Sequence, residues 1–247
     1  MIKRLFRLSV ISAVFSLAFA ATAAAQDFEK TYRIGAGGHV SVSNVSGDVV
    51  VTAYDGDAIM VRGIKKGRDR ELVSVEDRSG EGRVEVGARY PKNCNCEASI
   101  TFEVQVPRSV SYNFDGISSV SGNVEISNVT GRLRASAVSG DVKVTNVSGS
   151  VSANSVSGDV RVEVDRLDGS DDMKFSSVSG DVTVRMPSNL DAEVDISSFS
   201  GAIKTDFPIE VREERHGTRA YARGRLGNGS RQLHMSSVSG DLSLRRF

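Results

Sequence analysis

The chain has 247 residues, with 31 basic and 31 acidic side chains and two cysteines. This balance excludes a typical nucleic-acid-binding protein, which carries a clear basic excess. Two cysteines cannot form the framework of a disulfide-rich scaffold, and a chain of this length buries a sizeable core without such crosslinks.

Residues 1–25 are predicted to be a signal peptide, the alternative being a membrane anchor helix. Three of the first seven residues are basic, Leu8–Ala20 is an apolar run too short for a comfortable membrane span, and small residues at 23–25 precede Gln26. Residues 26–247 then hold 28 basic and 31 acidic side chains, a net charge of −3. The sequence predicts an exported protein, whether periplasmic, cell-surface or secreted, with no membrane span after cleavage.

The two cysteines, Cys94 and Cys96, are candidates for a local disulfide. Thiols in an oxidising compartment tend to pair. Residues i and i+2 of a flat strand lie near the upper limit of disulfide reach, so the bond needs a turn, which Pro91 and Asn93 would supply. Free thiols are the main alternative, and a redox or metal role is disfavoured because the Cys-x-x-Cys spacing is absent.

A plain phrase, Val-Ser-Gly-Asp-Val-x-Val, recurs along the chain. An early copy surrounds Gly47, and later copies follow at steps of nine residues and then of 22, 21 and 39. Their glycines are Gly122, Gly131, Gly140, Gly149, Gly158, Gly180, Gly201 and Gly240. Apolar residues then alternate with polar ones, as in Val160–Val164, which predicts a strand with one buried face. The glycine is expected to turn the chain with a positive φ.

Nine residues hold one strand and one corner, so two phrases make one coil of 18 residues. The steps of 22 and 21 then correspond to single coils with longer corners, and the step of 39 to two coils. On this spacing one edge stacks Gly122, Gly140, Gly158, Gly180 and Gly201, and the other edge stacks Gly131 and Gly149. The predicted fold is all-β: one right-handed parallel β-solenoid over 26–247, with two-strand coils of about 18–22 residues, most regular at 117–203. A β-sandwich is the alternative.

Two groups of acidic residues are candidate calcium ligands. The first group forms a column at the glycine corners, about 4.8 Å apart per coil, where stacked carboxylates repel unless solvent, a basic side chain or a cation intervenes. The second surrounds Gly169 in a lengthened coil. They are Asn123, Asp141, Asp159 and Asp181, and Asp165, Asp168, Asp171 and Asp172. Neither has the spacing of a calcium-binding repeat or loop, so we expect solvated turn residues and no metal or cofactor.

The other reactive side chains form no catalytic pattern. The histidines are scattered, without a His-Glu-x-x-His pair, and no Gly-x-Ser-x-Gly turn precedes a helix. The basic stretch from Arg212 to Arg225 is interrupted by two glutamates, which indicates a solvated face rather than an anion site. The histidines are His39, His216 and His234.

The order of these phrases resembles the bacterial putative-adhesin family of β-strand-repeat proteins, a domain family of unknown function. GGHVSVSNVSGDVVVTAYDGDAIMVRG is similar to its opening strands, ASITFEVQVPRSVSYNFDGISSVSGNVEI to its middle, and GNGSRQLHMSSVSGDLSLRRF to its close. The resemblance covers most of the chain after residue 25. It implies a β-helix-like fold on an exported protein and no catalytic residues.

Two functions follow as hypotheses. The first is an exported, non-enzymatic protein with an adhesin-like or structural role in the cell envelope, whose partner is an envelope glycan or protein and whose open solenoid ends could join copies. The second is a carbohydrate-active β-helix enzyme, a lyase or glycosidase, which needs paired carboxylates in a groove built by long loops. The coils are short and the loops few, so the sequence favours the first hypothesis, although fold alone does not fix function.

Overall fold

The structure is a computed structural model that describes residues 28–213 and 219–247. The predicted signal peptide lies outside these residues. The strands are β1 (Phe28–Tyr32), β2 (His39–Ser46), β3 (Val49–Tyr54), β4 (Ile59–Lys66), β5 (Ser74–Asp77), β6 (Arg83–Arg89), β7 (Ser99–Pro107), β8 (Tyr112–Ser121), β9 (Val124–Ser127), β10 (Thr130–Ser139), β11 (Val142–Ser155), β12 (Val160–Arg166), β13 (Met173–Ser179), β14 (Val182–Met186), β15 (Ala192–Ser200), β16 (Ile203–Thr205), β17 (Val211–Glu213), β18 (Ala220–Leu226), β19 (Gln232–Ser239) and β20 (Leu242–Arg246). A 3-10 turn, Arg70–Leu72, is also present. No helix in the described residues has the length and apolar character that a membrane span requires.

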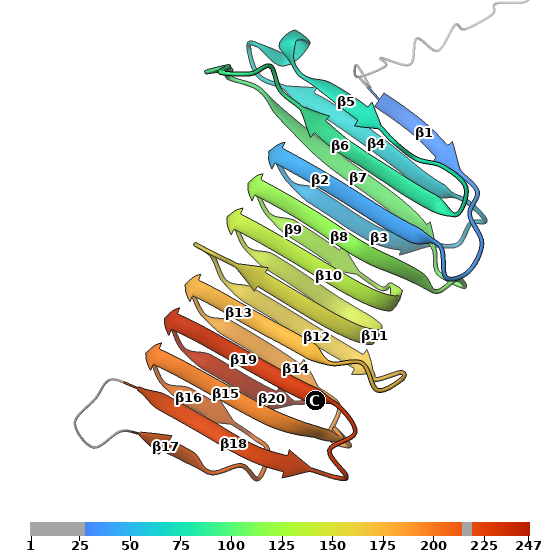
Figure 1. Ribbon diagram of the computed structural model, residues 1–247. Helices are drawn as coiled ribbons and strands as arrows, with labels where there is room; N and C mark the ends of the chain where they lie inside the picture. The colour runs from blue at the N-terminus through green and yellow to red at the C-terminus, as the bar shows by residue number, and fades with distance from the viewer. Residues whose placement is uncertain (1–27, 214–218) are drawn as a thin grey trace, which may run out of the picture.

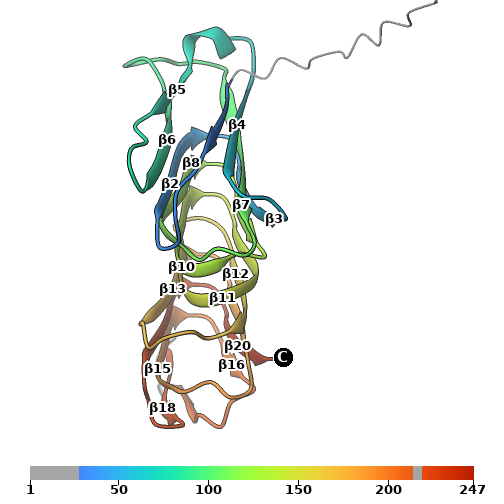
Figure 2. The same cartoon turned by 90° about the vertical axis from the view of Figure 1, so that its right-hand side faces the viewer.

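The strands lie in two layers along an elongated molecule (Figures 1 and 2). The front sheet of Figure 1 has the order β5-β6-β2-β8-β10-β11-β13-β19-β15-β18-β17. The back sheet has the order β1-β4-β7-β3-β9-β11-β12-β14-β20-β16. Strand β11 is long enough to pass from the back sheet to the front sheet, so it belongs to both.

The register shows coils of the expected size in the middle of the chain. Val142 pairs in parallel with Val124 on one side and with Val160 on the other, each 18 residues away. Val160 pairs with Val182, 22 residues further on. The all-β solenoid is therefore confirmed, and the parallel ladders argue against an antiparallel β-sandwich. Chains of buried, alternating apolar side chains from both sheets fill the interior.

The order of the coils at the C-terminal end differs from the prediction. The coil β19–β20 lies between the coils β13–β14 and β15–β16, so Val182 pairs with Leu242, and Leu242 pairs with Ile203. The expectation that Gly201 stacks on Gly180 is wrong, as is the division of the 39-residue step into two successive coils. The last strands of the chain are interior strands because this placement pairs both of their edges.

The N-terminal end is arranged in the same way. The coil β2–β3 lies between β6–β7 and β8–β9, so β2 pairs with both β6 and β8 while β3 pairs with both β7 and β9. Each end of the parallel stack then carries antiparallel strands: β4, β1 and β5 at one end, and β18 with β17 at the other. In Figure 1 these are the outermost strands of the molecule.

An ion pair joins the two sheets at the N-terminal end. Lys30 of β1 donates to Asp77 of β5 at 2.5 Å, and the Ser79 backbone N–H donates to the same carboxylate at 3.0 Å. Partial burial opposes ionisation of Asp77, but these two donors prevail and hold its pKa well below the ordinary value. A carboxyl group with a lowered folded-state pKa stabilises the fold at a pH above its unfolded-state pKa.

We therefore expect Asp77→Asn to lower the free energy of unfolding by about 1–2 kcal/mol at pH 7. This figure already allows for solvent screening of the ion pair, because Lys30 is half exposed. The difference from wild type should shrink as the pH falls below about 4, because the carboxyl group is then protonated first in the unfolded wild-type chain, and this protonation favours unfolding. Urea titrations at several pH values measure this. Asp57→Asn, whose carboxylate is 85% exposed and 3.9 Å from Arg33, is the matched control and should change little. A difference that stays constant down to pH 2 would contradict the assignment.

Candidate interaction surface

The glycines of the repeated phrase stack in one column along a single edge of the solenoid. The order is Gly47, Gly122, Gly140, Gly158, Gly180, Gly240 and Gly201. A Cβ on any of the last six would collide with the backbone carbonyl of the glycine before it in the column. Only Gly47 of this column has a positive φ, so the expected positive φ at Gly158 and its equivalents is wrong. These corners require glycine because two backbones approach closely.

The opposite edge does use the left-handed region. Gly131 and Gly149 pair with each other and both have a φ of 131°. A side chain at either position would be strained by the backbone conformation and would also meet the carbonyl of the neighbouring coil. The two edges of the solenoid therefore require glycine for different reasons, although the two phrases look alike in the sequence.

The acidic column forms a hydrogen-bonded ladder beside the glycines. The backbone N–H of Asp159 donates to Oδ1 of Asp141 at 2.9 Å, and that of Asp181 donates to Oδ1 of Asp159 at 2.9 Å. At the other steps too, a backbone N–H donates to the side-chain oxygen of the equivalent residue in the neighbouring coil. The pairs are Asn123 to Asp48, Asp141 to Asn123, Asp241 to Asp181 and Ala202 to Asp241. Arg161 pairs with Asp159 at 2.6 Å and lies 3.7 Å from Asp141. The repulsion expected in this column is thus offset by N–H donors and by an arginine.

This ladder predicts that Asp159→Asn keeps stability within about 0.5 kcal/mol of wild type, because an amide oxygen accepts the same bond, as Asn123 does. Asp159→Ala should cost about 1–2 kcal/mol, because the N–H of Asp181 loses its acceptor. Thermal melts with calcium and with chelator should give the same ranking. A loss of melting temperature in Asp159→Asn that is confined to calcium buffer would instead make the column a metal site.

A second ladder lies inside the corner. Three residues before most of the glycines a buried serine donates to the glycine carbonyl of the adjacent coil, as Ser155 does to Gly140 at 2.8 Å and Ser177 to Gly158 at 2.9 Å. Ser119, Ser237 and Ser198 make the equivalent bonds, and Asn44 takes the serine position in the first coil. In one coil Ala137 stands at this position and supplies no donor.

We expect Ala137→Ser to raise the free energy of unfolding by about 1 kcal/mol, because the new hydroxyl faces the carbonyl of Gly122. Ser155→Ala should lower it by about 1–2 kcal/mol, since a buried carbonyl loses its donor. Ser152→Ala, on the outer side of the same strand, is the control and should stay within about 0.5 kcal/mol. Urea titrations measure all three, and a destabilised Ala137→Ser would show that the corner is packed too tightly for a hydroxyl.

The residue two positions before each glycine of the column points outward and is apolar. These side chains are Val45, Val120, Val138, Val156, Val178, Val238 and Phe199, in their order along the stack, and they are between 41% and 53% exposed. They make up seven of the eleven large apolar side chains that are exposed in the described residues. Pairs such as Ser177↔Ser237 and Ser179↔Ser239 hold successive members of the column side by side.

A column of small polar side chains runs parallel to this apolar column, two residues further back on each strand. It consists of Ser43, Ser118, Ser136, Asn154, Ser176, Ser236 and Ser197. Together the two columns form an uncharged surface on the front sheet, near the C-terminal ends of its parallel strands, which lie along one long edge in Figure 1. We call these fourteen positions the valine–serine strip.

The outer face of the back sheet is different because it carries paired charges. Lys143 donates to Glu125 at 2.8 Å across one coil step, and Arg185 donates to Glu163 at 3.2 Å across another. Such ladders keep this face hydrated, and exposed pairs of this kind contribute little to stability. The outer face of the back sheet is therefore charged and solvated, whereas the strip on the front sheet is uncharged and half apolar.

Three carboxylates of the acidic loop around Gly169 make ion pairs or hydrogen bonds with other residues of the protein. Arg132 makes a bidentate contact with Asp171 at 2.8 and 3.0 Å, and Arg166 pairs with Asp168 at 3.1 Å. Asp172 accepts from the backbone N–H of Gln232 at 2.8 Å. Asp165 is exposed. Within residues 28–213 and 219–247 no three acidic, histidine or cysteine side chains converge as metal ligands.

Cys94 and Cys96 form a disulfide in the loop between β6 and β7, with Cα atoms 5.1 Å apart. The turn that this bond needs is present, since the Cys94 N–H donates to the Pro91 carbonyl and Asn93 has a φ of 58°. The bond closes the corner of one of the outermost coils, at the N-terminal end of the stack. Among the residues that the structure describes, the two cysteines belong to no cluster of three or more side chains that could hold a metal ion.

The histidines and the arginine stretch do not combine into a site. His39 contacts Asp115 on the outer face of the front sheet, and His234 lies further along the same sheet, while His216 is outside the described residues. Arg223 pairs with Asp195 at 3.1 Å and Arg212 with Glu210 at 2.8 Å.

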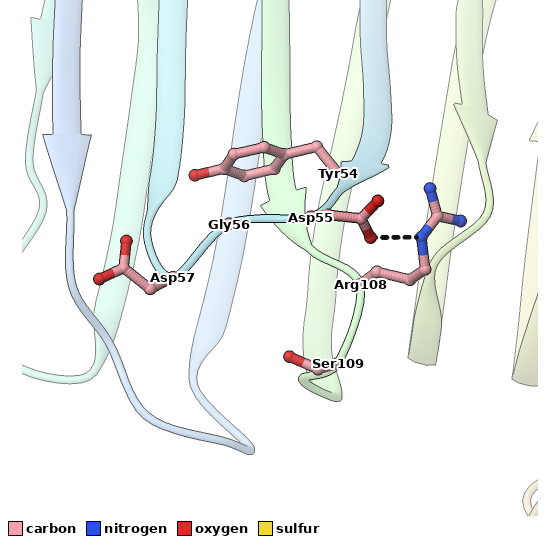
Figure 3. Close-up of a pocket in the computed structure, with 6 residues that line it drawn as sticks. All are labelled: Tyr54, Asp55, Gly56, Asp57, Arg108 and Ser109. Carbon is pink, nitrogen blue, oxygen red and sulfur yellow. Dashed lines mark hydrogen bonds and ion pairs between the residues drawn. The ribbon is translucent and has the colours of Figure 1, made fainter.

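A hollow of about 740 Å³ lies where β3 and β7 end, beside Tyr54, Asp55, Asp57 and Arg108 (Figure 3). The Asp55 carboxylate accepts a hydrogen bond from Nε of Arg108 at 3.2 Å. The Tyr54 hydroxyl donates to the Ala58 carbonyl at 2.6 Å. The carboxylates are 88% and 85% exposed, and in Figure 3 they lie on opposite sides of the turn at Gly56. A glycosidase acid is a carboxyl group in a buried, apolar setting, whereas both carboxylates of this hollow are exposed to solvent.

Sequence reasoning missed the strip, although its signal was available. Every phrase carries Val or Phe two positions before the column glycine, and strand alternation places that residue on the face opposite to the buried serine. The alternation that predicts the strands begins after the glycine, so it places this valine on neither face. The buried serine three positions before the glycine, which an apolar core would not suggest, is what places the valine on the outer face.

Several solved structures show a distant similarity to this chain. A putative cell adhesion protein from Clostridium sporogenes is 11% identical over 89% of this chain and 99% of its own, with a TM-score of 0.48. A putative adhesin from Bacteroides fragilis is 14% identical over 89% and 96%, with a TM-score of 0.41. A putative lipid binding protein from Parabacteroides distasonis has 14% identity, the same coverage and a TM-score of 0.31. No curated protein sequence matches the chain.

The match to a protein family covers residues 40–245, which includes every coil of the solenoid. The family is described as Toastrack DUF4097, a domain of unknown function. The resemblance inferred from the Val-Ser-Gly-Asp phrases is thereby confirmed, and the chain belongs to the Toastrack DUF4097 family.

Proposed function

We propose that this protein is exported and acts in the cell envelope as a non-enzymatic, adhesin-like interaction protein. The observation that carries the proposal is that the repeated polar side chains form hydrogen bonds within the protein. The repeated Ser and Asp residues bond one coil to the next, and the acidic loop is bound by Arg132, Arg166 and the backbone of Gln232. Little polar chemistry is left to converge on a substrate, whereas a long surface of uniform composition is left free.

The shape of the molecule supports the same function. A stack of parallel coils gives a rigid, elongated body whose surface repeats about every 4.8 Å. Such a surface suits contact with an extended partner better than it suits catalysis, which needs converging groups in a desolvated cleft. An envelope glycan or an envelope protein is the partner that the predicted export favours.

Two measurements test the proposal. The mature protein from the source bacterium should be found outside the cytoplasm with Gln26 as its first residue, as N-terminal sequencing will show. Purified protein 26–247, mixed with isolated cell envelopes, should sediment with them in a saturable manner that excess unlabelled protein competes away. An intact Met1 in the exported fraction, or no saturable binding, would contradict the proposal.

The enzymatic alternative is tested on the same envelopes. We expect no release of reducing ends or unsaturated sugars when the purified protein is incubated with envelope polysaccharide. Release that is lost in the variant Asp55→Asn/Asp57→Asn would support a carbohydrate-active enzyme, because these two carboxylates line the hollow of Figure 3. The substitutions are on a fully exposed turn, so they should not affect folding.

A further inference from the structure

The valine–serine strip presents more apolar surface than a solvated face needs. Its seven half-exposed apolar side chains together offer on the order of 500 Å², which is the size of the largest apolar patches on monomers, many of them functional. With the serine column and its margins, the strip approaches the roughly 800 Å² per partner that a stable protein–protein interface buries.

The composition of the strip is that of an interface core. None of its fourteen positions is charged, although charged residues make up 25% of the whole chain. Charges begin at its margins, with Arg134 and Lys174 on one side, the Asp ladder on the other, and Arg219 over the Phe199 ring at one end. An uncharged, apolar centre with a polar rim is the arrangement found in protein interfaces.

The periodicity of the strip limits what can cover it. Its side chains repeat once per coil, at the spacing of hydrogen-bonded strands, about 4.8 Å. Seven successive contacts stay in register only with a partner that has the same spacing along its whole length. A second copy of this chain meets that condition automatically, because its own strip has the same spacing.

Packing geometry also fits a second copy. Valine and serine are small, so two such strips can approach as closely as two sheets in a β-sandwich, about 10 Å apart. An isologous contact needs a surface that matches itself, and Val156 is the middle member of the seven. We propose that two copies of this protein dock face to face through their valine–serine strips to form a dimer. This inference goes beyond the proposed function, since it requires no envelope ligand.

Sedimentation equilibrium of the purified protein 26–247, at concentrations from about 1 to 100 μM, tests the proposal. We expect a monomer–dimer equilibrium for wild type. Val178→Glu places a charge in the apolar column and should raise the dimer dissociation constant at least 100-fold. The matched control is Thr183→Glu, which adds the same charge to the same coil on the outer face of the back sheet, and it should dimerise like wild type.

A thermal melt of each variant shows whether it is folded. If Val178→Glu does not fold, Val156→Glu replaces it in the comparison. A wild type that stays monomeric throughout would overturn the proposal, and so would a dimer that is unaffected by either charge, because copies would then join elsewhere. If wild type is monomeric but Val178→Glu no longer sediments with envelopes, the strip binds a foreign partner and self-docking is wrong. Normal envelope binding by Val178→Glu with loss of the dimer would support both proposals separately.

Discussion

Removal of residues 232–247 should prevent the C-terminal third of the protein from folding. The deleted coil β19–β20 lies between β13–β14 and β15–β16, so its loss leaves a gap inside the stack. Four fully buried side chains go with it: Leu233, Met235, Leu242 and Leu244. At about 1.5–3 kcal/mol each, their burial amounts to on the order of 6–12 kcal/mol. That is comparable with the whole stability of an ordinary domain, about 5–15 kcal/mol.

The matched control is a deletion of residues 245–247 only. These residues lie outside the core, with Phe247 55% exposed and Arg245 in an exposed pair with Asp206, so we expect a loss of about 1 kcal/mol. Urea unfolding followed by circular dichroism compares the two truncated chains, and limited proteolysis locates the damage. We expect cleavage throughout 187–231 in the longer deletion. A longer deletion that unfolds cooperatively, within about 2 kcal/mol of wild type, would mean that β15–β16 can stack directly on β13–β14.

Gly158→Ala should lower the free energy of unfolding by about 3–5 kcal/mol, more than most alanine substitutions on a surface edge. The added Cβ would point at the carbonyl oxygen of Gly140, and this atom is fixed by the strands on both sides of the corner. The collision is with backbone, so it cannot be relieved by a change of rotamer, and the two coils must separate. The displacement of the backbone at Gly158 should also disturb the next coil, because Gly180 packs against the Gly158 carbonyl in the same way.

Gly80→Ala is the control, since a Cβ there meets nothing within 4 Å and the φ of Gly80 is one that other residues adopt. We expect a change within about 0.5 kcal/mol. Urea titrations of both variants give the comparison. If Gly158→Ala is tolerated, neighbouring coils are further apart at this edge than the structure has them, and the Asp ladder beside it should be broken as well.

Local sequence determined the unit of this fold. Alternation in Val160–Val164 identifies a half-buried strand, and the 18-residue return of the phrase sets the partner of Val142 on each side. The requirement for glycine at the corners was also visible, but its cause was not. Positive φ is a property of one residue, whereas the close approach of Gly158 to Gly140 exists only when two coils are stacked.

The structural role of individual polar residues also became visible only in the tertiary structure, because it depends on contacts between coils. Asp159 looks like a solvated turn residue in the sequence, but in the stack its carboxylate accepts the N–H of Asp181 from the next coil. The strip emerged in the same way, because one exposed valine is ordinary and only stacking sets Val156, Val178 and Val238 side by side.

The order of the coils became visible only in the tertiary structure. The coils that carry Gly180, Gly201 and Gly240 present the same Ser-Gly corner, so their glycines and buried serines do not discriminate between the possible orders. Only the Asp ladder does, because Ala202 donates its backbone N–H to Asp241 but has no carboxylate to accept a bond from a further coil. The antiparallel strand β18 covers the outer edge of β15, and the last coil of the chain finds both of its edges paired only by entering between β13–β14 and β15–β16. Repetition in the sequence determined the shape and spacing of each coil, and the need to pair and cover the final edges determined which coil lies beside which.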